Sequence, residues 1–244
     1  MRCQLARAGP SGSTPSMRLF FWLMPFVITN VAFAAPAPPP ELIAALKTFR
    51  AEPPAGWSFT QTTSAEGESL VERCDAAKPA FARWTLVQKD GRAPTEEEAR
   101  DYAEVRSRRS RSGTAPKVTD QIDVTSITLA QETAERATFH ARLVPGETRD
   151  TTAAFLRVAI VFHKPTSTIE ALELSSTEAF SPTLGVRIAI MKTTLRYSLP
   201  TKEAPSLPLE VTTHVRGRAF WLKSLDADMR VAFSDYVSAV AKTN

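Results

Sequence analysis

Hydrophobic and polar residues alternate with a period of two along most of the chain beyond residue 50. The range 155–163 shows this pattern clearly, because Leu, Val, Ile and Phe occupy every second position and Arg, Ala, Val and His lie between them. Such alternation is typical of a β-strand that buries one face and exposes the other to water. The same pattern predicts further strands, among them 57–63, 121–130, 134–143, 168–175, 186–197 and 207–215.

Two segments depart from this pattern and predict helices. In the range 41–49, two leucines four residues apart and Phe49 share the face of a short amphipathic helix. The range 95–109 begins with Thr95 and Glu98, at the spacing of a capping box. Glutamates in the first turn and arginines in the last turn complement the helix dipole of this second helix.

The order of these elements predicts an α+β fold. Connections of hairpin length join consecutive strands, so we expect an antiparallel sheet rather than the alternating strands and helices of a parallel one. Arg216, Gly217 and Arg218 are predicted to form one tight turn, followed by a strand over 219–223. We expect a strongly curved antiparallel β-sheet, similar to an incomplete barrel, of about nine strands with two or three helices on one side.

The N-terminus has the character of a secretory signal peptide. Arg18 precedes a short apolar stretch, which ends in an Ala-Phe-Ala sequence. A basic start, an apolar core and an A-x-A site are typical of such signals, so cleavage is expected between Ala34 and Ala35. Met17 is the expected start of this signal. The apolar stretch is shorter than the roughly 20 residues of a transmembrane helix, so an uncleaved anchor is the less favoured alternative.

These features predict the domain organisation. The signal peptide covers 1–34, a Pro-rich extended linker covers 35–40, and a single α+β domain covers 41–244. No second apolar stretch of spanning length follows, so the mature chain is expected to be soluble. The expected location is the periplasm or the outside of the cell.

The composition narrows the class of partner. The chain has 30 Lys and Arg against 26 Asp and Glu, a net charge of +4, with 43% hydrophobic residues. Three arginines and no acidic residue fall within 1–34, so the remaining chain carries 27 basic and 26 acidic residues. A secreted and nearly neutral domain is a poor candidate for nucleic-acid binding, and we expect no such partner.

Catalytic and metal-binding motifs do not stand out. The three histidines, His140, His163 and His214, have neither the mutual spacing nor the cysteine neighbours of a zinc site. Cys74 is the cysteine that remains after the signal, and Glu72 on the same strand face is expected to raise its pKa. We therefore expect no catalytic residues, no metal and no cofactor, although convergence of the histidines would support a hydrolase.

Large aromatic residues on the predicted strands are candidates for a binding surface. On a sheet whose concave face stays open, they would line a pocket for an acyl chain, whereas in a closed sheet they would fill the core. The residues proposed to line such a pocket are Trp57, Phe59, Trp84, Phe162 and Trp221.

An arginine cluster at the end of the second helix is a candidate for contact with anionic groups, because guanidinium groups match phosphate oxygens. The alternative interpretation is a solvated end of the helix. The cluster consists of Arg106, Arg108, Arg109 and Arg111.

Two short motifs carry a resemblance to known proteins. One is Trp84-x-Leu86 followed by Asp90-Gly91 and Pro94-Thr95, and the other is Val-Arg-Gly-Arg-Ala-Phe over 215–220 with Phe-Ser-Asp-Tyr over 233–236. Together they resemble uncharacterised secreted proteobacterial proteins, which are similar in layout to the periplasmic outer-membrane lipoprotein carrier (LolA-like) group. The resemblance implies an incomplete antiparallel barrel whose helices cover a hydrophobic cavity, and it assigns no functional residue here.

Two functions remain open at this point. The first is a non-enzymatic periplasmic protein that binds a lipid or lipoprotein acyl chain on the hydrophobic concave face of its sheet. The alternative is a cell-envelope module with a filled core, which binds a protein partner through its arginine-rich loop. Peripheral contact with a membrane is compatible with both.

Overall fold

The structure of the chain is a computed structural model, which describes residues 37–109, 118–145, 152–220 and 222–239. The chain divides into two compact units, Met1–Ala34 and Ala35–Asn244, and every described residue belongs to the second. The predicted signal peptide and its cleavage site at Ala34 and Ala35 lie outside the described residues. The predicted periplasmic location therefore stays a prediction.

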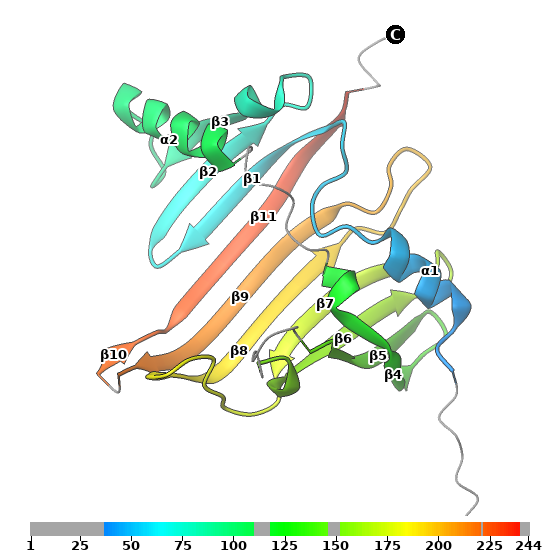
Figure 1. Cartoon of the computed structure of the whole chain (residues 1–244). Helices are drawn as coiled ribbons and strands as arrows, with labels where there is room; N and C mark the ends of the chain where they lie inside the picture. Colours follow the sequence, from blue (N-terminus) through cyan, green and yellow to red (C-terminus); the bar gives the residue numbers. More distant parts are fainter. Residues whose placement is uncertain (1–36, 110–117, 146–151, 221, 240–244) are drawn as a thin grey trace, which may run out of the picture. The chain divides into compact units, whose positions relative to one another are not determined.

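An open antiparallel sheet forms the centre of the second unit (Figure 1). Ten of its strands follow in the order β3-β2-β1-β11-β9-β8-β7-β6-β5-β4, and β10 pairs with β9 beyond this path. Two α-helices accompany it, α1 (Pro40–Thr48) and α2 (Glu96–Arg109), with the short 3-10 helices Ala80–Ala82, Val118–Gln121 and Thr152–Phe155. The strands are β1 (Trp57–Ala65), β2 (Glu68–Cys74), β3 (Trp84–Lys89), β4 (Ile122–Glu132), β5 (Arg136–Leu143), β6 (Leu156–His163), β7 (Thr168–Ser176), β8 (Val186–Tyr197), β9 (Pro208–Ala219), β10 (Lys223–Ser224) and β11 (Ala227–Ser238).

The predicted fold class, a mostly antiparallel α+β sheet that does not close, is confirmed. The described part contains eleven strands rather than about nine. The strand predicted over 219–223 is not present with these bounds, because Ala219 ends β9 and Lys223 begins the two-residue β10. The pairing of β1 with β11 places the first and the last strand of the described chain side by side in one sheet.

The prediction of a turn over Arg216, Gly217 and Arg218 is wrong. These residues continue β9, and the chain turns only after Ala219. Gly217 is needed inside the strand because a Cβ there would lie 2.7 Å from the backbone oxygen of Arg187 on β8. The glycine therefore permits a close approach of two strands, rather than a reversal of the chain.

One face of the sheet, called here the inner face, can be followed across all ten strands of the path. Residues directly opposite in antiparallel pairs lie on the same face, so the register connects side chains from strand to strand. From β2 the inner face continues through Gln61 on β1 to Phe233 on β11. Two residues further along β1, a row of directly opposite residues crosses the sheet from β1 to β4. This row consists of Thr63, Val231, Val211, Leu195, Leu172, Ile160, Phe139 and Leu129.

Both helices cover this inner face, at opposite ends of the strand order (Figure 1). Leu42 and Leu46 of α1 are 0% and 3% exposed, and they pack in one core with Ile160 and Leu172. The helix α2 reaches the inner face through Glu72 on β2. The predicted placement of the helices on one side of the sheet is therefore confirmed.

The start of α2 follows from its sequence. The Thr95 hydroxyl accepts a hydrogen bond from the Glu98 amide at 3.2 Å, and the Glu98 carboxylate accepts one from the Thr95 amide at 2.9 Å. The predicted capping box is thus present. Arg92 also donates two hydrogen bonds to Glu98, each at 2.8 Å, and these contacts fix the start of the helix.

Candidate functional site

A cavity of about 510 Å³ lies on the inner face of β4, β5 and β6, beside the start of α1, and is called here the β4–β6 cavity. Ile127, Ala137, Phe139 and Phe162 form its floor and are each at most 4% exposed. These side chains alternate with outward-facing residues on their strands, so the period of two places them together. The further lining residues are Ala37, Pro38, Pro39, Glu41, Leu129, Glu132, Lys164 and Ser167.

The floor and the rim of this cavity differ in polarity. Leu129, 44% exposed, extends the apolar wall toward water. At the rim, Lys164 and Glu132 form an ion pair with Nζ and Oε1 2.9 Å apart. Glu41 and Ser167 add two further polar groups. An apolar interior with a few polar groups at its edge is typical of small-molecule sites, and the volume falls in their usual range of roughly 300–1,000 Å³.

The segment from Ala37 to Pro39 forms the wall opposite the sheet. The carbonyl of Pro39 accepts hydrogen bonds from the amides of Leu42 and Ile43, at 3.1 and 3.3 Å, and Pro40 occupies the first turn of α1. Proline is favoured at this position because it lacks the amide hydrogen that would be unpaired there. The burial of Leu42 then holds the helix, and with it this wall, against the sheet.

A second cavity, of about 270 Å³, lies at the other end of α1. Ser167 lines both cavities, so they adjoin along the same helix. Tyr197 is among the residues that line the second cavity, and its buried hydroxyl has no hydrogen-bond partner among the described residues. Burial raises the pKa of this phenol, so it stays protonated and offers a donor. A buried unpaired hydroxyl is costly, which suits a site for water or for a polar group of a ligand.

The opposite end of the inner face, under α2, is built around Glu72. Its side chain is 3% exposed and accepts hydrogen bonds from Tyr102 at 2.6 Å, Gln61 at 2.8 Å and the Nε of Arg106 at 3.1 Å. Arg106 lies over Trp84, with 4.3 Å between the guanidinium carbon and the ring centroid. The buried carboxylate is therefore fully partnered and connects α2 to the sheet.

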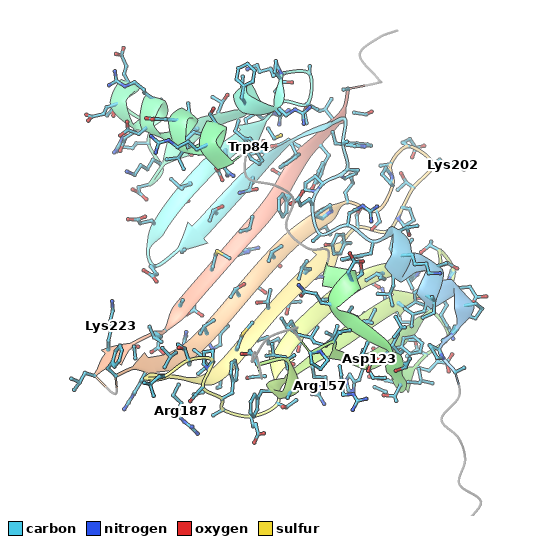
Figure 2. The ribbon with its side chains drawn as sticks, in the orientation of Figure 1. Trp84, Asp123, Arg157, Arg187, Lys202 and Lys223 are labelled. Carbon is cyan, nitrogen blue, oxygen red and sulfur yellow. The ribbon has the colours of Figure 1, made fainter. Side chains whose placement is uncertain are left out.

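The aromatic residues predicted to line a pocket fall into two groups. Trp57, Phe59 and Trp84 belong to one aromatic cluster with Phe233 and Tyr236, and ring centroids in it lie 5.5–6.3 Å apart. This cluster fills the inner face beside α2, and Figure 2 shows Trp84 under that helix.

The remaining two predicted lining residues are separated from this cluster. Phe162 lies at the far end of the strand order, in the floor of the β4–β6 cavity. Trp221 lies outside the described residues. Of the five aromatic residues, Phe162 is thus the one that the structure places against a described cavity. Whether the others contact a ligand stays a prediction.

The arginines predicted to contact anionic groups have partners within the fold. Arg106 binds Glu72 as described, and Arg108 forms an ion pair with Glu104 one turn earlier in α2. The side chain of Arg109 and the whole of Arg111 lie outside the described residues. An anionic partner for this cluster stays a prediction, and Arg106 would have to leave a buried pair in order to bind it.

The histidines do not converge. They lie on β5, β6 and β9, where His163 binds Thr166 at 2.7 Å and His214 pairs with Asp228. Within the described segments, no three His, Cys, Asp or Glu side chains form a group that would hold a metal ion. Cys74 is free and buried, and burial raises its pKa. The predicted direction of this pKa shift is right but its predicted cause is not, because burial and then the charge of Asp75 raise the pKa rather than Glu72.

Sequence reasoning missed most of the β4–β6 cavity. Ile127, Leu129 and Phe139 were visible as apolar positions of one predicted hairpin, but nothing local indicates that a helix from residues 40–48 covers them. The ion pair of Lys164 with Glu132 joins two different turns of the sheet. The usable signal was the apolar face of 121–130 and 134–143, where aliphatic residues and Phe139 line the cavity rather than tryptophans.

None of the helices in the described ranges combines the length and the hydropathy that a membrane span requires. No family model and no curated protein matches the chain. Among solved structures, the chain is similar to a domain from Vibrio parahaemolyticus provisionally described as an outer membrane lipoprotein-sorting protein. The match covers 84% of this chain and 92% of that one, with 9% sequence identity and a TM-score of 0.33. At this TM-score the likeness carries no functional argument.

Proposed function

We propose that this protein binds the acyl chain of a lipid or lipoprotein in the β4–β6 cavity, without catalysis. The observation that carries the proposal is the cavity of about 510 Å³ with a floor of buried Ile127, Phe139 and Phe162. An apolar ligand would remove the exposed side of Leu129 from water, which favours binding by roughly 25 cal/mol per Å² of apolar surface.

The rim of the cavity suits a ligand with one polar end. Lys164 is half-buried, and its ammonium group is held at the edge by Glu132. A carboxylate or phosphate at the end of an acyl chain would meet this ammonium group, while the chain itself would lie over Phe139 and Phe162. The resulting preference is for anionic amphiphiles over neutral hydrocarbons.

The proposed location is the periplasm, after cleavage between Ala34 and Ala35. In that form the wall of the cavity, which includes Ala37, begins two residues after the new N-terminus. The wall is anchored through Pro39 and Leu42 to the helix and the sheet. Cleavage would therefore leave the cavity intact.

The test introduces a charge into the cavity wall. Leu129→Arg is the variant of choice because Leu129 lines the cavity and is 44% exposed, so that an arginine is tolerated by the fold. Leu209→Arg is the matched control, since Leu209 is 43% exposed and lines none of the described cavities. Binding of a fluorescent fatty acid should weaken about tenfold or more in the first variant only, as expected for a charge in an apolar site.

Native mass spectrometry of the protein recovered from a periplasmic extract provides the second arm. An added mass that a lipid accounts for supports the proposal, and Leu129→Arg should reduce its occupancy. A bare polypeptide mass together with no binding of the fluorescent fatty acid contradicts it. Equal binding of the fatty acid by Leu129→Arg and Leu209→Arg would show that it binds outside the β4–β6 cavity. That result would also contradict the proposal.

A further inference from the structure

Apart from the β4–β6 cavity, the sheet has a surface of exposed apolar and basic side chains where β8 begins, β9 ends and β10 lies. Three large apolar side chains are exposed there, Leu184 at 94%, Phe220 at 71% and Leu222 at 95%. Three basic residues accompany them, Arg187, Arg218 and Lys223. These six residues are called here the β8–β10 tip, and Figure 2 shows Arg187 and Lys223 at the same end of the sheet.

The tip is one continuous surface because backbone contacts join its segments. Val186 pairs with Ala219 and Arg187 with Arg218, so the turns at both strand ends lie side by side. The amide of Phe220 donates a hydrogen bond to the carbonyl of Gly185 at 2.6 Å. A Cβ on Gly185 would lie 2.6 Å from the ring of Phe220, which shows how closely the ring covers that glycine.

The basic residues of the tip have no charged or hydrogen-bonding side-chain partner in the part of the chain that the structure describes. Arg187 and Arg218 are directly opposite each other on β8 and β9, an arrangement in which like charges repel. Among the described residues, neither of them nor Lys223 forms an ion pair or a side-chain hydrogen bond. By contrast, the neighbouring Arg216 is paired with Asp228 at 2.7 Å.

A cavity of about 780 Å³ lies at this place, and its charged lining residues are Arg187, Arg216, Arg218 and Asp226. Its acidic lining residue, Asp226, already accepts a hydrogen bond from the amide of Gly217 at 3.2 Å. The two opposed guanidinium groups and Leu222 also line it. Guanidinium groups bind phosphate oxygens with two parallel hydrogen bonds, so an external phosphate would relieve the repulsion between Arg187 and Arg218.

We propose that the β8–β10 tip docks the protein on the surface of an anionic phospholipid bilayer. Exposed leucine and phenylalanine side chains enter the boundary between headgroups and acyl chains. The arginines and Lys223 lie on the adjoining strand ends, where their charges would attract lipid phosphates. The combination distinguishes this surface from scattered exposed leucines, which are normal on any protein. The inference does not rest on the acyl-chain proposal, since it involves a different part of the sheet.

The experiment measures binding of the compact unit Ala35–Asn244 to vesicles of phosphatidylcholine with and without phosphatidylglycerol. Binding should require phosphatidylglycerol and should weaken as salt rises, because salt screens exposed charges. Arg187→Ser with Arg218→Ser should weaken binding about 30-fold, the effect of two basic residues near an anionic surface. Leu184→Ser with Leu222→Ser should weaken it about tenfold through the lost apolar contact.

The matched control removes two positive charges elsewhere. Arg100 on α2 and Lys202 in the loop before β9 are exposed, and Figure 2 shows Lys202 at the opposite end of the sheet from Lys223. Arg100→Ser with Lys202→Ser should change binding by less than about twofold, since neither charge lies at the docked surface. Unfolding temperatures equal to that of the wild type exclude misfolding as the cause of any loss.

A second readout reports the depth of the tip. Leu222→Cys labelled with a polarity-sensitive dye should shift its emission on addition of anionic vesicles, and Val105→Cys on α2 should not. Cys74 is buried and is therefore protected from labelling. Equal binding of the tip variants and the control, or equal binding to neutral vesicles, would overturn the proposal. Leu129→Arg should bind anionic vesicles as the wild type does. Vesicle binding by the tip is therefore tested separately from fatty-acid binding in the β4–β6 cavity.

Discussion

The two helices cover the same face of one sheet, but they do so with different chemistry. Under α1 the contact is apolar, since Leu42 and Leu46 are almost completely buried against aliphatic and aromatic side chains. Under α2 the contact centres on the buried ion pair between Glu72 and Arg106. The strands between them carry half-buried residues such as Val211 and Val231.

This difference has a consequence for function. An apolar contact is not directional, so a helix can cover a sheet imperfectly and leave a cavity lined with hydrocarbon. A buried carboxylate needs all its hydrogen bonds, so the α2 contact leaves no space around Glu72. The β4–β6 cavity accordingly occurs beside α1, whereas the described aromatic residues beside α2 pack into a filled cluster.

The largest expected effect concerns the ion pair under α2. Arg106→Leu would leave Glu72 buried with its charge uncompensated, and we expect a loss of about 4 kcal/mol in the free energy of unfolding. The matched variant Glu72→Leu with Arg106→Leu should cost less, because no charge then remains buried. Urea unfolding of both variants measures the two values. A single variant as stable as the double variant would show that the pair does not hold α2 in place.

The next effect concerns the apolar contact under α1. Leu42→Ala should cost about 3 kcal/mol, because Leu42 is 0% exposed and its removal opens a void in the core. This loss should be the same at low and high salt, because an apolar contact has no charges for salt to screen. Urea unfolding of the wild type and Leu42→Ala at two salt concentrations measures it. A salt-dependent cost for Leu42→Ala would contradict the contrast between the helices.

The smallest effect concerns the capping box of α2 at acid pH. Hydrogen bonds from Arg92, Thr95 and Lys89 hold the pKa of Glu98 well below its ordinary value of 4.5. A lowered folded pKa means that its stabilisation is fully present above about pH 4.5 and is lost as the pH falls toward the folded value. Near neutral pH, amide hydrogens in the first turn of α2 should therefore exchange faster in Glu98→Gln than in the wild type. This difference in exchange rate should shrink in acid. A difference that stays the same in acid would argue against a role for the Glu98 charge.

Much of the fold could be predicted because its signals are local. The spacing of Leu42 and Leu46 and the pairing of Thr95 with Glu98 each lie within one or two helical turns, and both predictions are confirmed. Alternation over 155–163 likewise identified the buried face of β6. The turn predicted at Gly217 failed because a glycine admits a tight turn and a close strand contact equally, and only the neighbouring strand decides between them.

The cavity could be predicted only in part. Phe162 was identified, but Trp57, Phe59 and Trp84 lie in a cluster near the other end of the sheet. Arg106 resembled a surface charge in the sequence, yet it reaches Glu72 across 34 positions of the chain. Periodicity tells which residues share a face, but it carries no information about which helix will cover that face.

By itself, the sequence determined the antiparallel strands, the two helices, the capping box of α2 and the alternation that separates one face from the other. These depend on neighbours within a few residues, where sterics and hydrogen bonding act directly. Tertiary structure alone decided that β1 pairs with β11, which strands each helix covers, and that Arg187 and Arg218 oppose each other. Such contacts join residues far apart in the chain, so their positions follow from strand order and packing rather than from local pattern.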